Sequence, residues 1–176
     1  EEFLNGVAVA VADEYRRHAY LAESALLSEY DRAAFDRLAS GEAEAVEVKA
    51  SLQLLSRLLF KHHGRRVVVL IDEYDAPVMA AYTNGFYSEV IDFVKAWLTA
   101  ALKSSEALAF ACLTGVQRIS KESIFSDLNN LGVNTALNVV SDERYGFTDA
   151  EVAALAQYLG RGDAMAEARR WYDGYR

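Results

Sequence analysis

The sequence predicts an α/β fold with a parallel sheet, and three observations support this prediction. Residues 67–71 and residues 108–113 are short apolar runs, which is typical of strands buried on both faces of a parallel sheet. Between them, apolar residues from Val90 to Ala101 recur at helical spacing. A helix between two buried strands is the order expected for parallel strands joined by a right-handed crossover.

Length and composition fit one globular domain or part of one. The chain has 176 residues, of which 52% are hydrophobic and 25% are charged. The net charge of −8 disfavours direct binding of nucleic acid or acidic membrane. Because there is no signal peptide and no membrane-spanning apolar run, we expect a cytoplasmic protein without membrane contact. The single cysteine, Cys112, lies in an apolar run, which predicts a buried side chain.

Helical patterns precede the first predicted strand. The N-terminal residues repeat apolar side chains at helical spacing, although Val7, Val9 and Val11 also alternate as in a strand, and we favour the helix. A second helix is predicted over residues 28–41, from a capping pair at its start to a glycine at its end. A third covers residues 48–64, with basic residues in its last turn before the terminating glycine.

The C-terminal third is predicted to be mainly helical. Residues 137–140 form a third and weaker strand candidate. Thr148 and Glu151 have the spacing of a capping box and open a helix that runs to Leu159. A last helix is predicted over residues 163–171.

The strongest chemical signal is Asp72-Glu73 directly after the first apolar run, which is the Walker B pattern. A parallel strand delivers its carboxyl end to the ligand-binding edge of the sheet. There an Asp can hold Mg²⁺, and the next Glu can polarise the water that attacks a γ-phosphate. The pattern is short, and a core strand ending in surface carboxylates explains it equally well. Asp75 adds a third carboxylate, and clustered acids that need a cation favour a cofactor-binding role for Asp72 and Asp75.

A second signal is Thr114-Gly115 at the end of the other apolar run. A polar residue at this place can contact a γ-phosphate, although a simple strand-end turn is the default interpretation. Arg118 follows and is either a phosphate ligand or an ordinary surface arginine. The sequence contains no G-x-x-x-x-G-K-[ST] phosphate-binding loop.

Three longer motifs extend these signals. Residues 69–78 resemble the LIDEYDxPI signature of the AAA-ATPase-like family of prokaryotic proteins. Residues 113–131 are similar to that family's TGVxRxSKxSIFSxLNNL stretch, and residues 171–175 match its WYDGY. The resemblance implies a P-loop NTPase core of the additional-strand type, a three-layer α/β/α fold with a parallel sheet, here truncated at the N-terminus.

The resemblance also implies a division of the chain and a set of roles. Residues 1–145 are expected to form a partial core, with the Walker B strand at 67–71 and the sensor strand at 108–113, and residues 146–176 the start of a helical lid. The implied cofactors are ATP and Mg²⁺. The implied roles place Asp72 on the metal, Glu73 on the attacking water, and Thr114 and Arg118 near the γ-phosphate.

The family's phosphate-binding loop and a further strand are expected to precede these residues. We therefore expect weak or absent ATP binding by residues 1–176 alone, and self-association through the unpaired edge of residues 108–113. The whole protein is expected to hydrolyse ATP and in some cases to carry a C-terminal nuclease-like domain of the PD-(D/E)XK type. The alternative is a degenerate ATPase core that acts as a regulatory or protein-interaction module. Direct nuclease action by the acidic cluster is disfavoured, because Lys121 does not complete the required pattern.

Overall fold

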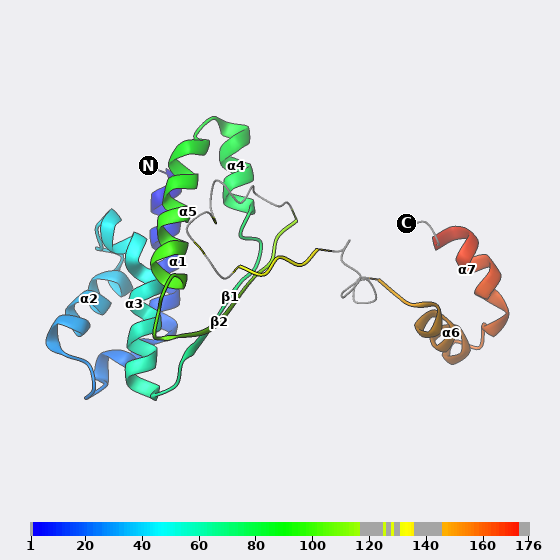
Figure 1. Ribbon diagram of the computed structural model, residues 1–176, viewed down its shortest axis with the longest axis horizontal. Helices are drawn as coiled ribbons and strands as arrows, with labels where there is room; N and C mark the ends of the chain where they lie inside the picture. The colour runs from blue at the N-terminus through cyan, green and yellow to red at the C-terminus, as the bar shows by residue number, and fades with distance from the viewer. Residues whose placement is uncertain (1, 117–124, 126–127, 129–130, 136–145, 173–176) are drawn as a thin grey trace. The chain divides into compact units, whose positions relative to one another are not determined.

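The computed structural model describes residues 2–116, 125, 128, 131–135 and 146–172 (Figure 1). The fold is mixed α/β, mostly helical with a parallel sheet of two strands in the described part of the chain. It divides into two compact units, Glu1–Leu131 and Gly132–Arg176. The expected functional division after residue 145 stays a prediction.

The first unit contains the sheet and most of the helices. Four helical elements come first: α1 (Glu2–Arg17), the short 3₁₀ helix η1 (Ala19–Glu23), α2 (Glu29–Ser40) and α3 (Ala45–His63). The remaining elements are β1 (Val67–Ile71), α4 (Ala76–Asn84), α5 (Tyr87–Leu102) and β2 (Leu108–Leu113). The strands and four of these helices, α1, α2, α3 and α5, occur where the sequence predicts them, so the favoured N-terminal helix is confirmed over the strand.

Helix α4 was not predicted, because its apolar residues do not form a single stripe along one face. Local signals for it are present in the sequence. Pro77 lies in the first turn, where its missing N–H is tolerated, and Gly85 ends the helix in the left-handed conformation.

The two strands pair in parallel register, with Val69 beside Ala111 and Ile71 beside Leu113. Successive side chains of a strand point to opposite faces of the sheet. On one face Val69 is only 6% exposed, whereas on the other face Leu70 is 74% exposed. Helix α3 packs against β1 and α5 packs against β2, so the helices cover the first of these faces.

The predicted burial of both strand faces is therefore wrong. Val68, Leu70, Phe110 and Cys112 share the second face, and all four side chains are exposed. An apolar run indicates that burial of the strand is favourable, but it does not show whether other elements pack on both faces of the sheet. In the described part of the chain, the third layer of the expected α/β/α arrangement does not cover this face.

Ser51 of α3 joins the helices of the core. Its backbone carbonyl accepts a hydrogen bond of 2.7 Å from the hydroxyl of Tyr15 in α1. Its side-chain oxygen accepts one of 3.1 Å from the indole Nε1 of Trp97 in α5. Burial raises the pKa of the Tyr15 phenol, so this hydroxyl remains a neutral donor. The three helices are thus held in one layer by packing and by these two bonds.

Asp31 of α2 is a buried carboxylate with two cationic partners on α3. Arg57 and Lys61 each donate to it at 2.8 Å, and Ser28 donates to it through both its backbone N–H and its hydroxyl. Burial by itself raises the pKa of this carboxyl, but the bonds from Lys61, Arg57 and Ser28 outweigh burial and hold the pKa well below its usual range. The predicted capping pair, Ser28 and Asp31, is confirmed and also ties α2 to α3.

The second unit contains α6 (Asp149–Tyr158), the 3₁₀ helix η3 (Gly162–Ala164) and α7 (Met165–Tyr172). The predicted capping box of Thr148 and Glu151 is confirmed. Neither α6 nor α7 contains a buried residue, and Arg169 links them through an ion pair of 2.6 Å with Asp149. The strand candidate at residues 137–140 lies outside the described residues. No described helix is both long and apolar enough to cross a membrane.

We expect Asp31→Asn to lower the free energy of unfolding by about 1–3 kcal/mol at pH 7, because Arg57 and Lys61 lose a charged acceptor. Because the pKa of Asp31 is lower in the folded state than in the unfolded state, its contribution to the free energy of unfolding is complete above the unfolded-state pKa of about 4. The contribution decreases as the pH falls below that value and is lost once the pH passes the folded-state pKa. Urea unfolding at pH 7 and pH 3 tests this. A control is Asp13→Asn, which removes an exposed pair with Arg16. A loss at pH 7 that persists unchanged at pH 3 contradicts the assignment.

We expect residues 1–176 to self-associate through the outer edge of β2, which no described strand covers. Ala109 is exposed on this strand, so Ala109→Lys places a charge there and reduces association. Light scattering against concentration measures the effect. Ala166→Lys, at an exposed position of α7, has the same charge change and serves as control. A wild-type chain that stays monomeric at high concentration contradicts the expectation.

Candidate functional site at the strand ends

The carboxyl ends of β1 and β2 lie side by side, and the pairing continues beyond both strands. The backbone N–H of Thr114 donates to the carbonyl of Ile71 at 2.9 Å. The N–H of Tyr74 then donates to the carbonyl of Thr114 at 3.0 Å. These two bonds place the acidic motif of the first strand against the Thr-Gly motif of the second.

Two hydrogen bonds orient the carboxylate of Asp72. Its Oδ1 accepts from the hydroxyl of Thr114 and, at 3.0 Å, from the backbone N–H of Glu73. The side chains of Asp72, Glu73 and Thr114 are all exposed. The hydrogen bond from Thr114 was not predicted from the sequence, and it gives an oriented Asp72 carboxylate that faces solvent.

Glu73 has a backbone φ of 53°, in the left-handed region that residues other than glycine rarely adopt. Such a conformation costs roughly 1–2 kcal/mol and persists only where the surroundings enforce it. Here the bonds of Asp72 and Tyr74 to Thr114 enforce it on either side. The sharp turn brings the chain from the strand to α4 and leaves the Glu73 side chain exposed.

Asp75 differs from these two acids because it is only 4% exposed. It precedes α4, and its carbonyl accepts the N–H of Met79 at 2.9 Å. A Cβ atom at Gly115 would lie 2.5 Å from Oδ1 of Asp75 and 2.8 Å from Cε1 of Tyr74. Glycine is therefore required at position 115, because Asp75 and the ring of Tyr74 pack directly on its backbone.

Of the predicted site residues, the structure brings together Asp72, Glu73, Asp75 and Thr114. Arg118 lies outside the described residues, and its role stays a prediction. Sequence reasoning missed the parts played by Tyr74 and Gly115. Gly115 follows Thr114 at a strand end, which signals a close backbone approach, but the approaching group lies some 40 positions earlier in the chain.

The carboxylate and hydroxyl oxygen atoms at the strand ends are ligands that suit a hard cation with several bound water molecules. In the part of the chain that the structure describes, no group of three or more His, Cys, Asp or Glu side chains is arranged as a metal site. A single oriented carboxylate is still what Mg²⁺ commonly uses, because water and substrate phosphates supply its other ligands. Asp72 fits that role by its exposure and its fixed Oδ1.

Comparison with known proteins agrees with the motifs at this site. A family profile described as "Predicted AAA-ATPase" matches residues 8–125, which include both strands and the strand-end residues. The chain belongs to this AAA-ATPase-like family.

A relative from Azotobacter chroococcum mcd 1, described as "Uncharacterized protein in vnfD 5'region", is 38% identical over 117 residues. The match covers 64% of this chain and only 22% of the relative. No solved structure matches the chain.

We expect Gly115→Ala to displace Asp75 or Tyr74 and to lower the free energy of unfolding by about 1–3 kcal/mol, as overpacking typically does. Thermal or urea unfolding measures the loss. Gly6→Ala is the control, since Gly6 lies in α1 with open space around it, and alanine there raises helix stability. A Gly115→Ala variant as stable as the wild type contradicts the close packing.

Proposed function

We propose that the protein containing these residues is an ATPase, and that the ends of β1 and β2 supply the metal-binding and water-positioning half of its active site. The observation that carries this proposal is the arrangement of Asp72. Its carboxylate is oriented by the hydroxyl of Thr114 and the backbone of Glu73, at the sheet edge where α/β proteins bind ligands.

Each strand-end residue has a distinct proposed role. Asp72 holds Mg²⁺ directly or through water, and when bound this ion neutralises charge on the phosphate oxygens. Glu73, exposed beside Asp72, orients and polarises the attacking water. Thr114 keeps Asp72 in position, and we retain Arg118 as a candidate for contact with the γ-phosphate. Asp75 packs beneath this group against Gly115 and supports the turn that presents Glu73.

The phosphate cradle of this proposed site is not encoded in residues 1–176, which contain no G-x-x-x-x-G-K-[ST] motif. We infer that another part of the polypeptide supplies it. The matched relative is long enough for this, because the aligned region is only 22% of its length. Residues 1–176 alone should therefore bind ATP·Mg²⁺ weakly or not at all.

A role as a protein-interaction module is the second candidate. It is favoured by the exposed apolar face of the sheet, formed by Val68, Leu70 and Phe110. This candidate requires no hydrolysis, so measurement of ATP turnover separates the two.

We expect Glu73→Gln in the full-length protein to lower the rate of ATP hydrolysis by about 10² or more and to leave nucleotide affinity nearly unchanged. The amide keeps the size of the side chain and removes the base. Glu89→Gln, at an exposed position of α5, is the control and should retain full turnover. Asp72→Asn should instead shift the Mg²⁺ dependence to higher concentration. Wild-type turnover in Glu73→Gln, or no turnover in the wild-type protein, argues against the ATPase and in favour of the interaction module.

A further inference from the structure

The ring of Tyr74 turns toward the core at the end of β1. Tyr74 is partly buried and packs against the hydrophobic core, whereas the side chains of Asp72 and Glu73 are exposed. The left-handed backbone of Glu73 lies directly before Tyr74. The turn thus separates two acids that face solvent from an aromatic ring that faces the core.

Tyr74 contacts the end of β2 with its backbone and with its ring. Its N–H donates to the carbonyl of Thr114 at 3.0 Å. A Cβ atom at Gly115 would lie 2.8 Å from Cε1 of the Tyr74 ring, so the ring packs directly on the glycine backbone. The two contacts fall on consecutive residues, so Tyr74 restrains this part of the backbone at two points.

The same ring is supported by Phe125. The two ring centroids lie 5.4 Å apart with the planes inclined by 60°, within the range of favourable aromatic pairs. Phe125 is buried and belongs to the hydrophobic core. Its carbonyl accepts the N–H of Leu128 at 3.1 Å, and Leu128 packs against the same core. The ring of Tyr74 thus connects the core to the backbone of Gly115.

Thr114 binds the turn after β1 through three polar groups. Its N–H donates to the Ile71 carbonyl, its carbonyl accepts from Tyr74, and its hydroxyl donates to Oδ1 of Asp72. Thr114 and Asp72 are both exposed, so water competes for the hydrogen bond between their side chains. That bond is favoured when the Thr114 backbone is already fixed, because less conformational freedom is lost on forming it. The ring of Tyr74 supplies part of this restraint.

We propose that Tyr74 is a positioning residue of the strand-end site, whose ring holds the Thr114-Gly115 backbone so that the Thr114 hydroxyl orients Asp72. Its role rests on the proposed ATPase function, in which Asp72 holds Mg²⁺. Removal of the groups that orient a metal ligand typically lowers metal affinity by about 10- to 100-fold. The contacts with Gly115 and Phe125 are made by the ring, so phenylalanine at position 74 keeps them.

The Mg²⁺ dependence of ATP hydrolysis in the full-length protein tests this role. Tyr74→Ala should raise the Mg²⁺ concentration for half-maximal turnover by about tenfold or more, and Tyr74→Phe should stay within about twofold of the wild type. Phe125→Leu keeps an apolar side chain in the core and removes the aromatic partner, so it should give an intermediate shift of roughly threefold. A shift in Tyr74→Phe as large as that in Tyr74→Ala overturns the role of the ring.

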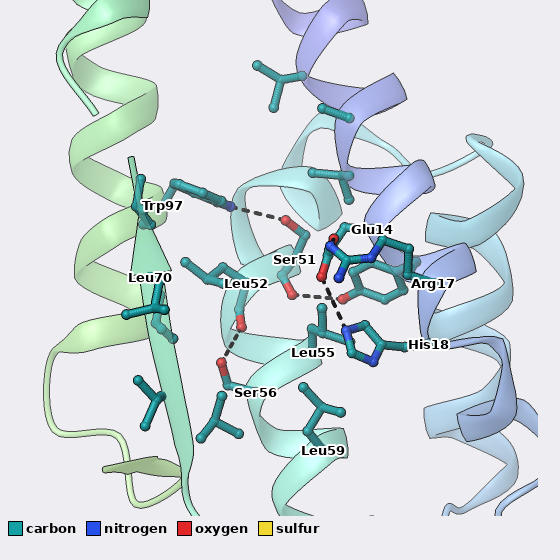
Figure 2. A pocket seen from close by; sticks show the side chains of 18 residues that line it. Glu14, Arg17, His18, Ser51, Leu52, Leu55, Ser56, Leu59, Leu70 and Trp97 are labelled. Atoms are coloured by element: carbon teal, nitrogen blue, oxygen red, sulfur yellow. Dashed lines mark hydrogen bonds and ion pairs between the residues drawn. The ribbon is translucent and has the colours of Figure 1, made fainter. Parts of the chain in front are cut away.

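Leu59→Ala is the matched control, because it also removes a partly buried apolar side chain that packs against the core. Leu59 lines a groove of about 700 Å³ that follows the edge of β1 and is lined by all five residues of this strand (Figure 2). It also lines a smaller cavity with Val67, the first residue of β1, so it lies at the strand end opposite to Asp72. Leu59→Ala should leave the Mg²⁺ dependence unchanged. Equal shifts in Leu59→Ala and Tyr74→Ala overturn the proposal, because they report a general loss of packing.

Amide hydrogen exchange without nucleotide gives a second measurement, which does not require ATP hydrolysis. In the full-length protein, Tyr74→Ala should accelerate exchange of the Thr114 amide by about tenfold or more, because the Thr114-Gly115 backbone loses the support of the ring. The Val69 amide, in the middle of the paired strands, should keep its rate in the same variant. Unchanged exchange at Thr114 overturns the proposal.

The two measurements separate the role of Tyr74 from the proposed function. Absence of ATP turnover in the wild-type protein contradicts the ATPase and with it the effect of Tyr74 on Mg²⁺. Turnover in the wild type, together with unchanged Mg²⁺ dependence and unchanged Thr114 exchange in Tyr74→Ala, keeps the ATPase and overturns only the positioning role.

Discussion

The parallel pairing of β1 with β2 is the constraint on which the candidate site depends. The register sets Ile71 beside Leu113, and the bond from the Thr114 N–H to the Ile71 carbonyl carries that register past the ends of the strands. Asp72 and Thr114 meet only because of this alignment. A shift of one residue would turn the side chains to the other face and would separate the carboxylate from the hydroxyl that orients it.

The packing of the helices determines which face of the sheet is covered. Ser51 ties α1 and α5 to α3, and the buried Asp31 ties α2 to α3 through Arg57 and Lys61. In the described part of the chain, this layer covers one face of the sheet, whereas the other face is exposed and a groove lines β1. The described residues thus pack closely around α3, and the sheet is exposed on one face.

The strand-end site combines local strain with tight packing. Glu73 adopts a left-handed conformation, and Gly115 allows Asp75 and Tyr74 to approach its backbone closely. These features cost stability, and the bonds of Asp72 and Tyr74 to Thr114 hold them in place. The Asp72 carboxylate is presented to solvent in a fixed orientation, which is the property that a metal-positioning role requires. Membership of the AAA-ATPase-like family agrees with the proposed role.

The sequence by itself determined the elements whose signals are local. The apolar runs marked β1 and β2, the capping pairs marked α2 and α6, and Asp72-Glu73 marked the end of the first strand. Helix α4 was missed because its apolar residues do not form one stripe. Only the tertiary structure decided that one sheet face is exposed, that Asp75 packs on Gly115, and that a groove follows the edge of β1. The physical reason is that an apolar run predicts a buried segment from local sequence. The residues that pack against it lie far away in the sequence, and only the tertiary structure identifies them.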